Sequence, residues 1–154
     1  MSMPSCATAE ATPVTSAAVP YLTYLREQDD PMCWEAPRMF HRCAELRRFA
    51  RFVETLEDHF GCRLDHDMGA GLVASAFHGD LFIEGATIRF SNFGRMIAVI
   101  EPGSLSRATR KLLAERADEH GYLLLPERFL HAPYTGRTPL VGTRMTWGGR
   151  FFGL

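Results

Sequence analysis

The chain has 154 residues, of which 46% are hydrophobic and 23% are charged, and its formal net charge is −1. This length is typical of one domain, which buries roughly 70% of its unfolded surface and needs no disulfide or metal to fold. The near-zero charge argues against a nucleic-acid partner, because phosphate binding usually demands a strong basic excess.

Residues 1–18 are rich in Ser, Thr, Ala and Pro and are predicted to be a disordered tail, whereas residues 19–154 are predicted to form a single α+β domain. The first residues lack the basic and apolar regions of a secretory signal. No run approaches the length of a membrane span. The four cysteines form no CxxC pair, which is typical of a reduced intracellular protein. We therefore expect a cytoplasmic bacterial protein without a membrane partner.

Residues 19–36 contain several large apolar side chains, so we expect them to dock on the domain, with a break near Asp30-Pro31. The strongest helix pattern follows and covers residues 38–60. Its large apolar residues recur at spacings of three and four and so share one stripe, which is made of Leu46, Phe49, Phe52, Val53, Leu56 and Phe60. Pro37 suits an early helix position and Gly61 the residue after the end. The pattern predicts a long N-terminal helix packed on a sheet.

Strand patterns follow at 72–77 and 80–84, which form either one bulged strand or a tight hairpin around His78-Gly79. Glu84-Gly85 then turns the chain into residues 87–91, which alternate like a half-solvated antiparallel strand. Residues 96–100 are apolar on both faces and are placed centrally. We predict an antiparallel sheet of about four strands.

The last third of the chain is predicted to contain one more helix and a docked tail. Ser104 can cap a helix over 104–120, and 122–125 reads as a short buried strand. Residues 127–154 are rich in Pro and Gly and are expected to be irregular. They carry so many large apolar groups that we expect this tail to lie on the body of the domain.

Few residues are candidates for a catalytic or metal-binding role, and each of them also has a structural explanation. Asp65-His66-Asp67 resembles a metal or acid–base cluster, although solvated turn residues explain it as well. Cys62 could work with His59 and Asp58 as a thiolate nucleophile, but a cysteine at a helix exit is more often a small core residue. An enzyme would be built around Asp65, His66, His78 and Cys62. We predict no catalysis, no metal and no cofactor.

The segment 54–67 holds five carboxylates and one arginine. A local acidic surface on a nearly neutral protein suits a basic partner, and an ordinary solvated helix end is the alternative. The residues predicted to contact a partner are Glu54, Glu57, Asp58, Asp65 and Asp67.

The last nine residues, TWGGRFFGL, resemble the pattern "TW..RFF..L" of small bacterial proteins encoded beside polymorphic or contact-dependent toxins. The segment 88–94 with the apolar strand after it, and the later helix running into Gly121-Tyr122, are similar to the same immunity proteins. The resemblance covers residues 80–154. It implies a non-catalytic protein that binds a cognate toxin domain and blocks it. It transfers no toxin-contacting residue, because immunity surfaces differ with each toxin.

Two further functions stay open. The chain could be a small-molecule-binding or regulatory module with a pocket between helix 38–60 and the sheet. It could also be an enzyme, provided that the four side chains named above meet at a common reacting atom.

Overall fold

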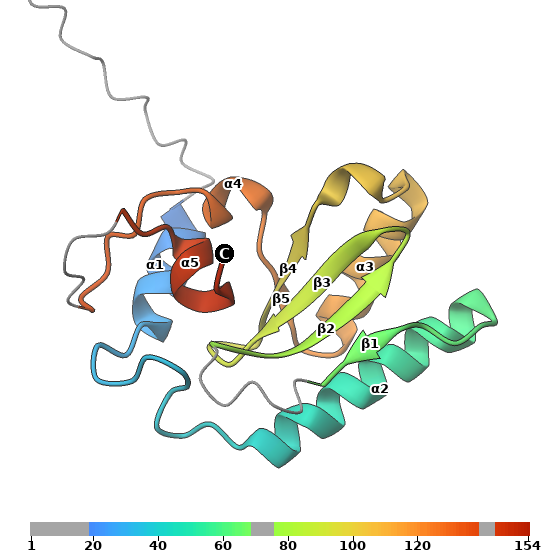
Figure 1. The fold of residues 1–154 in the computed structure, drawn as a ribbon, viewed down its shortest axis with the longest axis horizontal. Coiled ribbons are helices and arrows are strands. Elements are labelled where there is room, and N and C mark those ends of the chain that lie inside the picture. Colours follow the sequence, from blue (N-terminus) through green and yellow to red (C-terminus); the bar gives the residue numbers. More distant parts are fainter. Residues whose placement is uncertain (1–18, 69–75, 139–143) are drawn as a thin grey trace, which may run out of the picture.

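The computed structural model describes residues 19–68, 76–138 and 144–154, which form five helices and one sheet of five strands (Figure 1). The predicted disordered tail 1–18 and the predicted strand residues 72–75 lie outside the described residues. None of the helices in the described ranges combines the length and the apolar composition that a bilayer crossing requires.

The strands lie side by side in chain order, as β1 (His66–Asp67), β2 (Phe77–Ile83), β3 (Ala86–Ser91), β4 (Met96–Ile100) and β5 (Leu123–Leu124). The first three pairings are antiparallel and β4–β5 is parallel. The prediction of about four antiparallel strands is therefore wrong in the number of strands and in one pairing. The segment around His78-Gly79 is one strand with an irregularity between Phe77 and Gly79, not a hairpin.

The hairpin turns follow the predicted residues. Glu84 and Gly85 both have positive φ, at 50° and 80°, and they join β2 to β3. Gly94, at φ 60°, and Arg95, at φ 49°, join β3 to β4. A Cβ on Gly94 would lie 2.6 Å from the Gln28 side chain, so this turn needs glycine for space as well as for conformation.

The long helix is α2 (Arg42–Phe60), and its predicted stripe is buried at Phe49, Phe52, Val53 and Leu56. Gly61 ends it in the left-handed conformation, as predicted. The helix begins four residues later than predicted, and it is not the N-terminal helix, because α1 (Val19–Gln28) precedes it. Residues 37–40 form a turn instead, in which the Phe40 N–H donates to the Pro37 carbonyl.

The first core fills the space between one face of the sheet and the helices α2 and α3 (Arg107–Glu119). Its centre is a set of edge-to-face rings: the centroid of Phe90 lies 4.6 Å from that of Phe49, 5.5 Å from that of Phe52 and 5.2 Å from that of Tyr122. Burying each ring stabilises the fold by roughly 1.5–3 kcal/mol. The predicted helix 104–120 is shorter than expected, because residues 102–104 form a 3-10 turn and Ser106, not Ser104, caps α3 by accepting the Thr109 N–H.

The second core joins the two ends of the described chain against the other side of β4. There α1 lies beside the short helices α4 (Glu127–Leu130) and α5 (Trp147–Phe152) (Figure 1). Trp147, Phe151 and Phe152 are fully buried. The C-terminal segment is therefore docked, as predicted, but it is not irregular throughout, because it forms these two helices.

Candidate functional site

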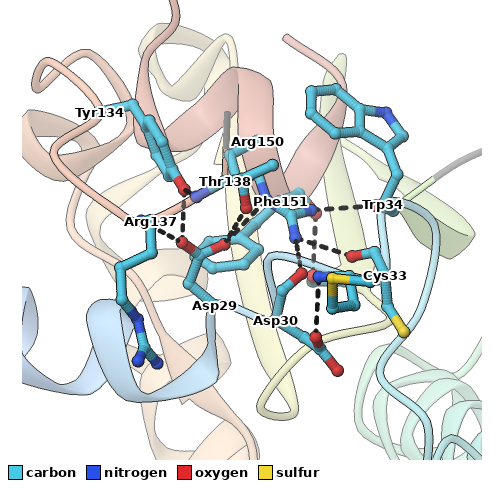
Figure 2. A network of polar contacts seen from close by, with 11 residues as sticks. Asp29, Asp30, Cys33, Trp34, Tyr134, Arg137, Thr138, Arg150 and Phe151 are labelled. Atoms are coloured by element: carbon cyan, nitrogen blue, oxygen red, sulfur yellow. Dashed lines mark hydrogen bonds and ion pairs between the residues drawn. The ribbon is translucent and has the colours of Figure 1, made fainter. Parts of the chain in front are cut away.

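A fully buried arginine connects the two ends of the described chain. Arg150 of α5 has no exposed side-chain surface, and its Nε donates to Asp29 Oδ1 at 3.0 Å, just after α1 ends (Figure 2). A buried charge is tolerated only when it is paired and hydrogen-bonded. The environment of Arg150 meets both conditions.

The remaining donors of Arg150 hold the segment that follows Asp29. Nη1 donates to the Trp34 carbonyl at 2.9 Å, and Nη2 donates to the carbonyls of Asp30 at 3.1 Å and Cys33 at 2.9 Å (Figure 2). The guanidinium carbon also lies 4.6 Å from the centroid of the Phe93 ring. One side chain thus sets the path of the backbone through residues 30–34.

Asp29 is held from the opposite side by the segment before α5. The Tyr134 hydroxyl donates to Oδ2, the Arg137 N–H donates to Oδ2 at 3.0 Å, and the Thr138 hydroxyl donates to Oδ1 at 3.0 Å. Burial by itself would raise the pKa of Asp29. The three hydrogen bonds and the Arg150 charge outweigh it, so the pKa lies below its ordinary value and the carboxyl group is ionised.

A second anchor lies one residue beyond Trp34. Asn92 Nδ2 donates to the Glu35 carbonyl at 2.8 Å, and Asn92 Oδ1 lies 3.1 Å from His78 Nδ1. Because an amide oxygen only accepts, His78 Nδ1 carries the proton. Burial lowers the pKa of His78, and its Nε2 has no hydrogen-bond partner in the part of the chain that the structure describes. This imidazole is neutral and supports the loop from inside the core.

The segment 30–41, held by these anchors, exposes large apolar side chains. Met32 is 78% exposed, Trp34 46% and Met39 79%. A hollow of about 290 Å³ begins at Met39 and is bounded by Glu45 of α2 and Arg95 of the β3–β4 turn. Methionine, tryptophan and arginine are enriched at protein interfaces. We call residues 30–41 the apolar segment.

The predicted acidic contact residues lie at the other end of α2. Glu54 and Asp58 are exposed on the helix, and Asp65 and Asp67 are exposed at the edge strand β1 and just before it. Glu57 is engaged locally, because it accepts the Leu64 N–H at 2.9 Å and an Arg63 N–H at 3.0 Å. The pKa of Glu57 is lowered, chiefly by the Leu64 N–H.

Most basic residues of α2 lie in its first half and most acidic residues in its second half. Arg47, Arg48 and Arg51 lie in its first ten residues, and Glu54, Glu57 and Asp58 lie in its last seven. A helix favours the reverse order, because its N-terminus carries partial positive charge. The exposed pairs Arg47–Arg51 and Glu54–Asp58 also place like charges four residues apart, which is destabilising. Glu45 in the first turn and the bonds of Glu57 to Leu64 and Arg63 offset part of this cost.

The four side chains proposed for an enzyme do not share an environment. His78 is 2% exposed in the core, whereas Cys62, Asp65 and His66 are exposed. Both imidazole rings contact Phe49, with centroids 6.4 Å away for His78 and 5.8 Å for His66. Within the described ranges, no three His, Cys, Asp or Glu side chains are placed to hold a metal ion.

The alternative pocket was expected between helix 38–60 and the sheet. The rings of the first core fill this space at the middle of α2, whereas the hollow of about 290 Å³ lies between the start of α2 and the end of β3. A larger hollow, of about 640 Å³, lies elsewhere. It is bounded by Tyr21 and Tyr24 of α1, by Arg95, and by Asp118 and Tyr122 around the end of α3.

No protein-family model, curated protein or solved structure matches this chain. Sequence reasoning missed Arg150 and Asp29, because their pairing spans 121 residues. A local feature could have drawn attention to Arg150: it is the one charged side chain in the nonapeptide 146–154, and it stands directly before two phenylalanines.

Proposed function

We propose that this chain is a non-catalytic binding protein that blocks a cognate bacterial toxin domain, as its resemblance to immunity proteins implies. The observation that carries the proposal is the apolar segment. Its backbone is held at residues 30, 33 and 34 by Arg150 and at residue 35 by Asn92, while its Met32, Trp34 and Met39 side chains face solvent. A rigid segment that exposes such residues loses little conformational entropy when a partner covers it.

The nonapeptide of the resemblance has a structural role that fits this proposal. Thr146 caps α5, Trp147, Phe151 and Phe152 fill the second core, and Arg150 holds the apolar segment. Residues of this kind can stay the same while the contact surface changes with the partner. The motif therefore supports a shared scaffold, and the surface residues carry the recognition.

The acidic residues Glu54, Asp58, Asp65 and Asp67 extend the proposed surface and supply electrostatic steering toward a basic partner. The helix α2 has 19 residues and is about 28 Å long, and the exposed Arg47 and Arg51 lie between its two ends, so a partner that covers both ends needs acidic groups at that level as well as basic ones. The unfavourable placement of acidic residues at its C-terminal end is consistent with a role in recognition.

The test is co-expression with the product of the adjacent gene, read as rescue of growth from its toxicity and as a complex by calorimetry. Trp34→Ala with Met39→Ala is expected to weaken binding by roughly thirty-fold or more. Phe82→Ser is the matched control, because Phe82 is 44% exposed on the sheet. It should bind like the wild type.

The contribution of the acidic residues to the association rate is tested separately. Glu54→Gln with Asp58→Gln is expected to slow association by about ten-fold at low salt, with little change in dissociation. The control is Glu115→Gln with Glu127→Gln, which removes the same charge from α3 and α4. Absence of any complex, or equal effects of test and control variants, would contradict the proposal.

The hollow of about 640 Å³ favours the second candidate, a small-molecule-binding module, at a position other than the one expected from sequence. Its tyrosine walls and the opposite charges of Arg95 and Asp118 suit an aromatic zwitterion. Thermal stabilisation by free tyrosine, lost in Arg95→Gln, would support this function.

A further inference from the structure

A cationic hollow lies where the first half of α2 meets the end of α3. Its volume is about 400 Å³, and its lining includes Arg47, Arg48 and Arg51 together with His120. We propose that this hollow is a binding site for a small phosphorylated molecule, and that Arg47 and Arg51 hold its phosphate beside Arg48. This inference is independent of the toxin-binding proposal.

The first support is the cost of bringing these cations together. Arg47 and Arg51 are exposed like charges at i and i+4, so they repel each other. Neither has a carboxylate within 4 Å among the residues that the structure describes. A bound anion would relieve this repulsion.

The second support is that Arg48, which also lines the hollow, is held in place by its neighbours. Its Nη1 donates to the His120 carbonyl at 3.4 Å, and its Nε lies 3.5 Å from Glu45. The imidazole of His120 is also positioned, since its Nε2 lies 3.1 Å from the Thr55 hydroxyl. Two groups of the lining are thus held in place before any ligand arrives.

The carboxylates nearby limit the size of the ligand. Glu119 lines the hollow, and it is paired with Arg116 at 2.5 Å. Along α2 the next exposed charges after Arg51 are Glu54 and Asp58. A long polyanion that followed the helix would meet these carboxylates, whereas a single phosphate would contact only the arginines. The charge pattern therefore favours a small phosphorylated molecule over nucleic acid.

Arginine is suited to this role, because its planar fork matches the oxygens of a phosphate in a bidentate way. Two guanidinium groups one turn apart, with a third beside them, can reach different oxygens of the same tetrahedral group. The hollow is larger than a phosphate, which leaves room for the organic part of the ligand.

The experiment is calorimetric titration with pyrophosphate at constant ionic strength, balanced with chloride. Saturable binding to one site is expected, and Arg47→Gln with Arg51→Gln should weaken it about ten-fold or more. Both side chains are exposed, so the variant should keep the far-UV circular dichroism of the wild type. The control, Arg107→Gln with Lys111→Gln, removes the same charge from α3 and should bind normally.

Two results would overturn the proposal. One is the absence of saturable pyrophosphate binding, or an equal loss in the control variant, since either would mean nonspecific attraction. The other is tighter binding of a short single-stranded oligonucleotide than of pyrophosphate with the same dependence on Arg47 and Arg51. That result would assign the arginines to nucleic acid instead.

Discussion

Replacing Arg150 by methionine tests whether one side chain organises the apolar segment. Methionine keeps an unbranched chain but removes all four donated hydrogen bonds, to Asp29 and to three backbone carbonyls. Breaking one side of a buried ion pair costs about 3–5 kcal/mol. The lower end applies here, because Asp29 keeps its hydrogen bonds from Tyr134, Arg137 and Thr138. We expect a loss of about 3 kcal/mol.

A domain of this size is typically stable by about 5–15 kcal/mol, so the variant should stay folded at 25 °C with a lower urea midpoint. Circular dichroism at pH 7 measures this loss. The fluorescence of Trp34 reports on the conformation of the apolar segment. It is measured in a background where Trp147, the other tryptophan, is replaced by phenylalanine. Acrylamide should quench Trp34 more strongly in the variant, because the carbonyl of Trp34 has lost its donor.

The matched control is Arg63→Met, which removes a 92% exposed arginine paired with Glu57 at 3.0 Å. Exposed ion pairs contribute little, so this change should cost less than about 1 kcal/mol. If Arg150→Met costs no more than Arg63→Met, or if Trp34 quenching is unchanged, the buried pair does not organise the segment.

Three further substitutions test other parts of the structure. Gly94→Ala should lower stability by about 1–3 kcal/mol in urea unfolding, because its φ is 60° and the new Cβ meets Gln28; a neutral result would contradict the turn geometry. Thr146→Ala should cost about 1 kcal/mol, since the hydroxyl oxygen accepts the Gly149 N–H at the start of α5, and Thr146→Ser should restore most of it. His78 has a lowered pKa in the folded state, so the unfolded chain binds its proton first, and stability should fall as pH drops below about 6.5 with a slope of at most ~1.4 kcal/mol per pH unit. His78→Gln should remove this slope in unfolding measured from pH 7.5 to 5, and an unchanged slope would mean that another group titrates.

The elements that sequence predicted well are those with local causes. The stripe of α2 follows from helical spacing, and the turns at Glu84-Gly85 and at Gly94 follow from backbone freedom. The start of α2 was placed too early, because apolar residues at 39 and 40 extend the pattern. In the structure Met39 is exposed and does not belong to the stripe.

The features that the sequence could not predict depend on contacts between residues that are far apart in the chain. Helix α5 has two glycines, which are poor helix formers, yet it forms because Trp147, Phe151 and Phe152 are buried together. The residues at its two ends, Thr146 as the N-cap and Gly153 in the left-handed conformation, are of the types that mark helix boundaries in a sequence. The parallel β4–β5 pairing depends on α3 crossing between the strands, which no local pattern specifies.

The pairing of Asp29 with Arg150 also bears on how the chain is made. Residue 29 leaves the ribosome long before residue 150, and until then the early aspartate and the carbonyls after it have no cationic partner. The core on α2 can assemble from residues 42–122, but the other side of the sheet stays open until the last helix emerges. A message cut short before codon 150 would thus yield a half-closed product with exposed aromatic surface, an evident substrate for proteases.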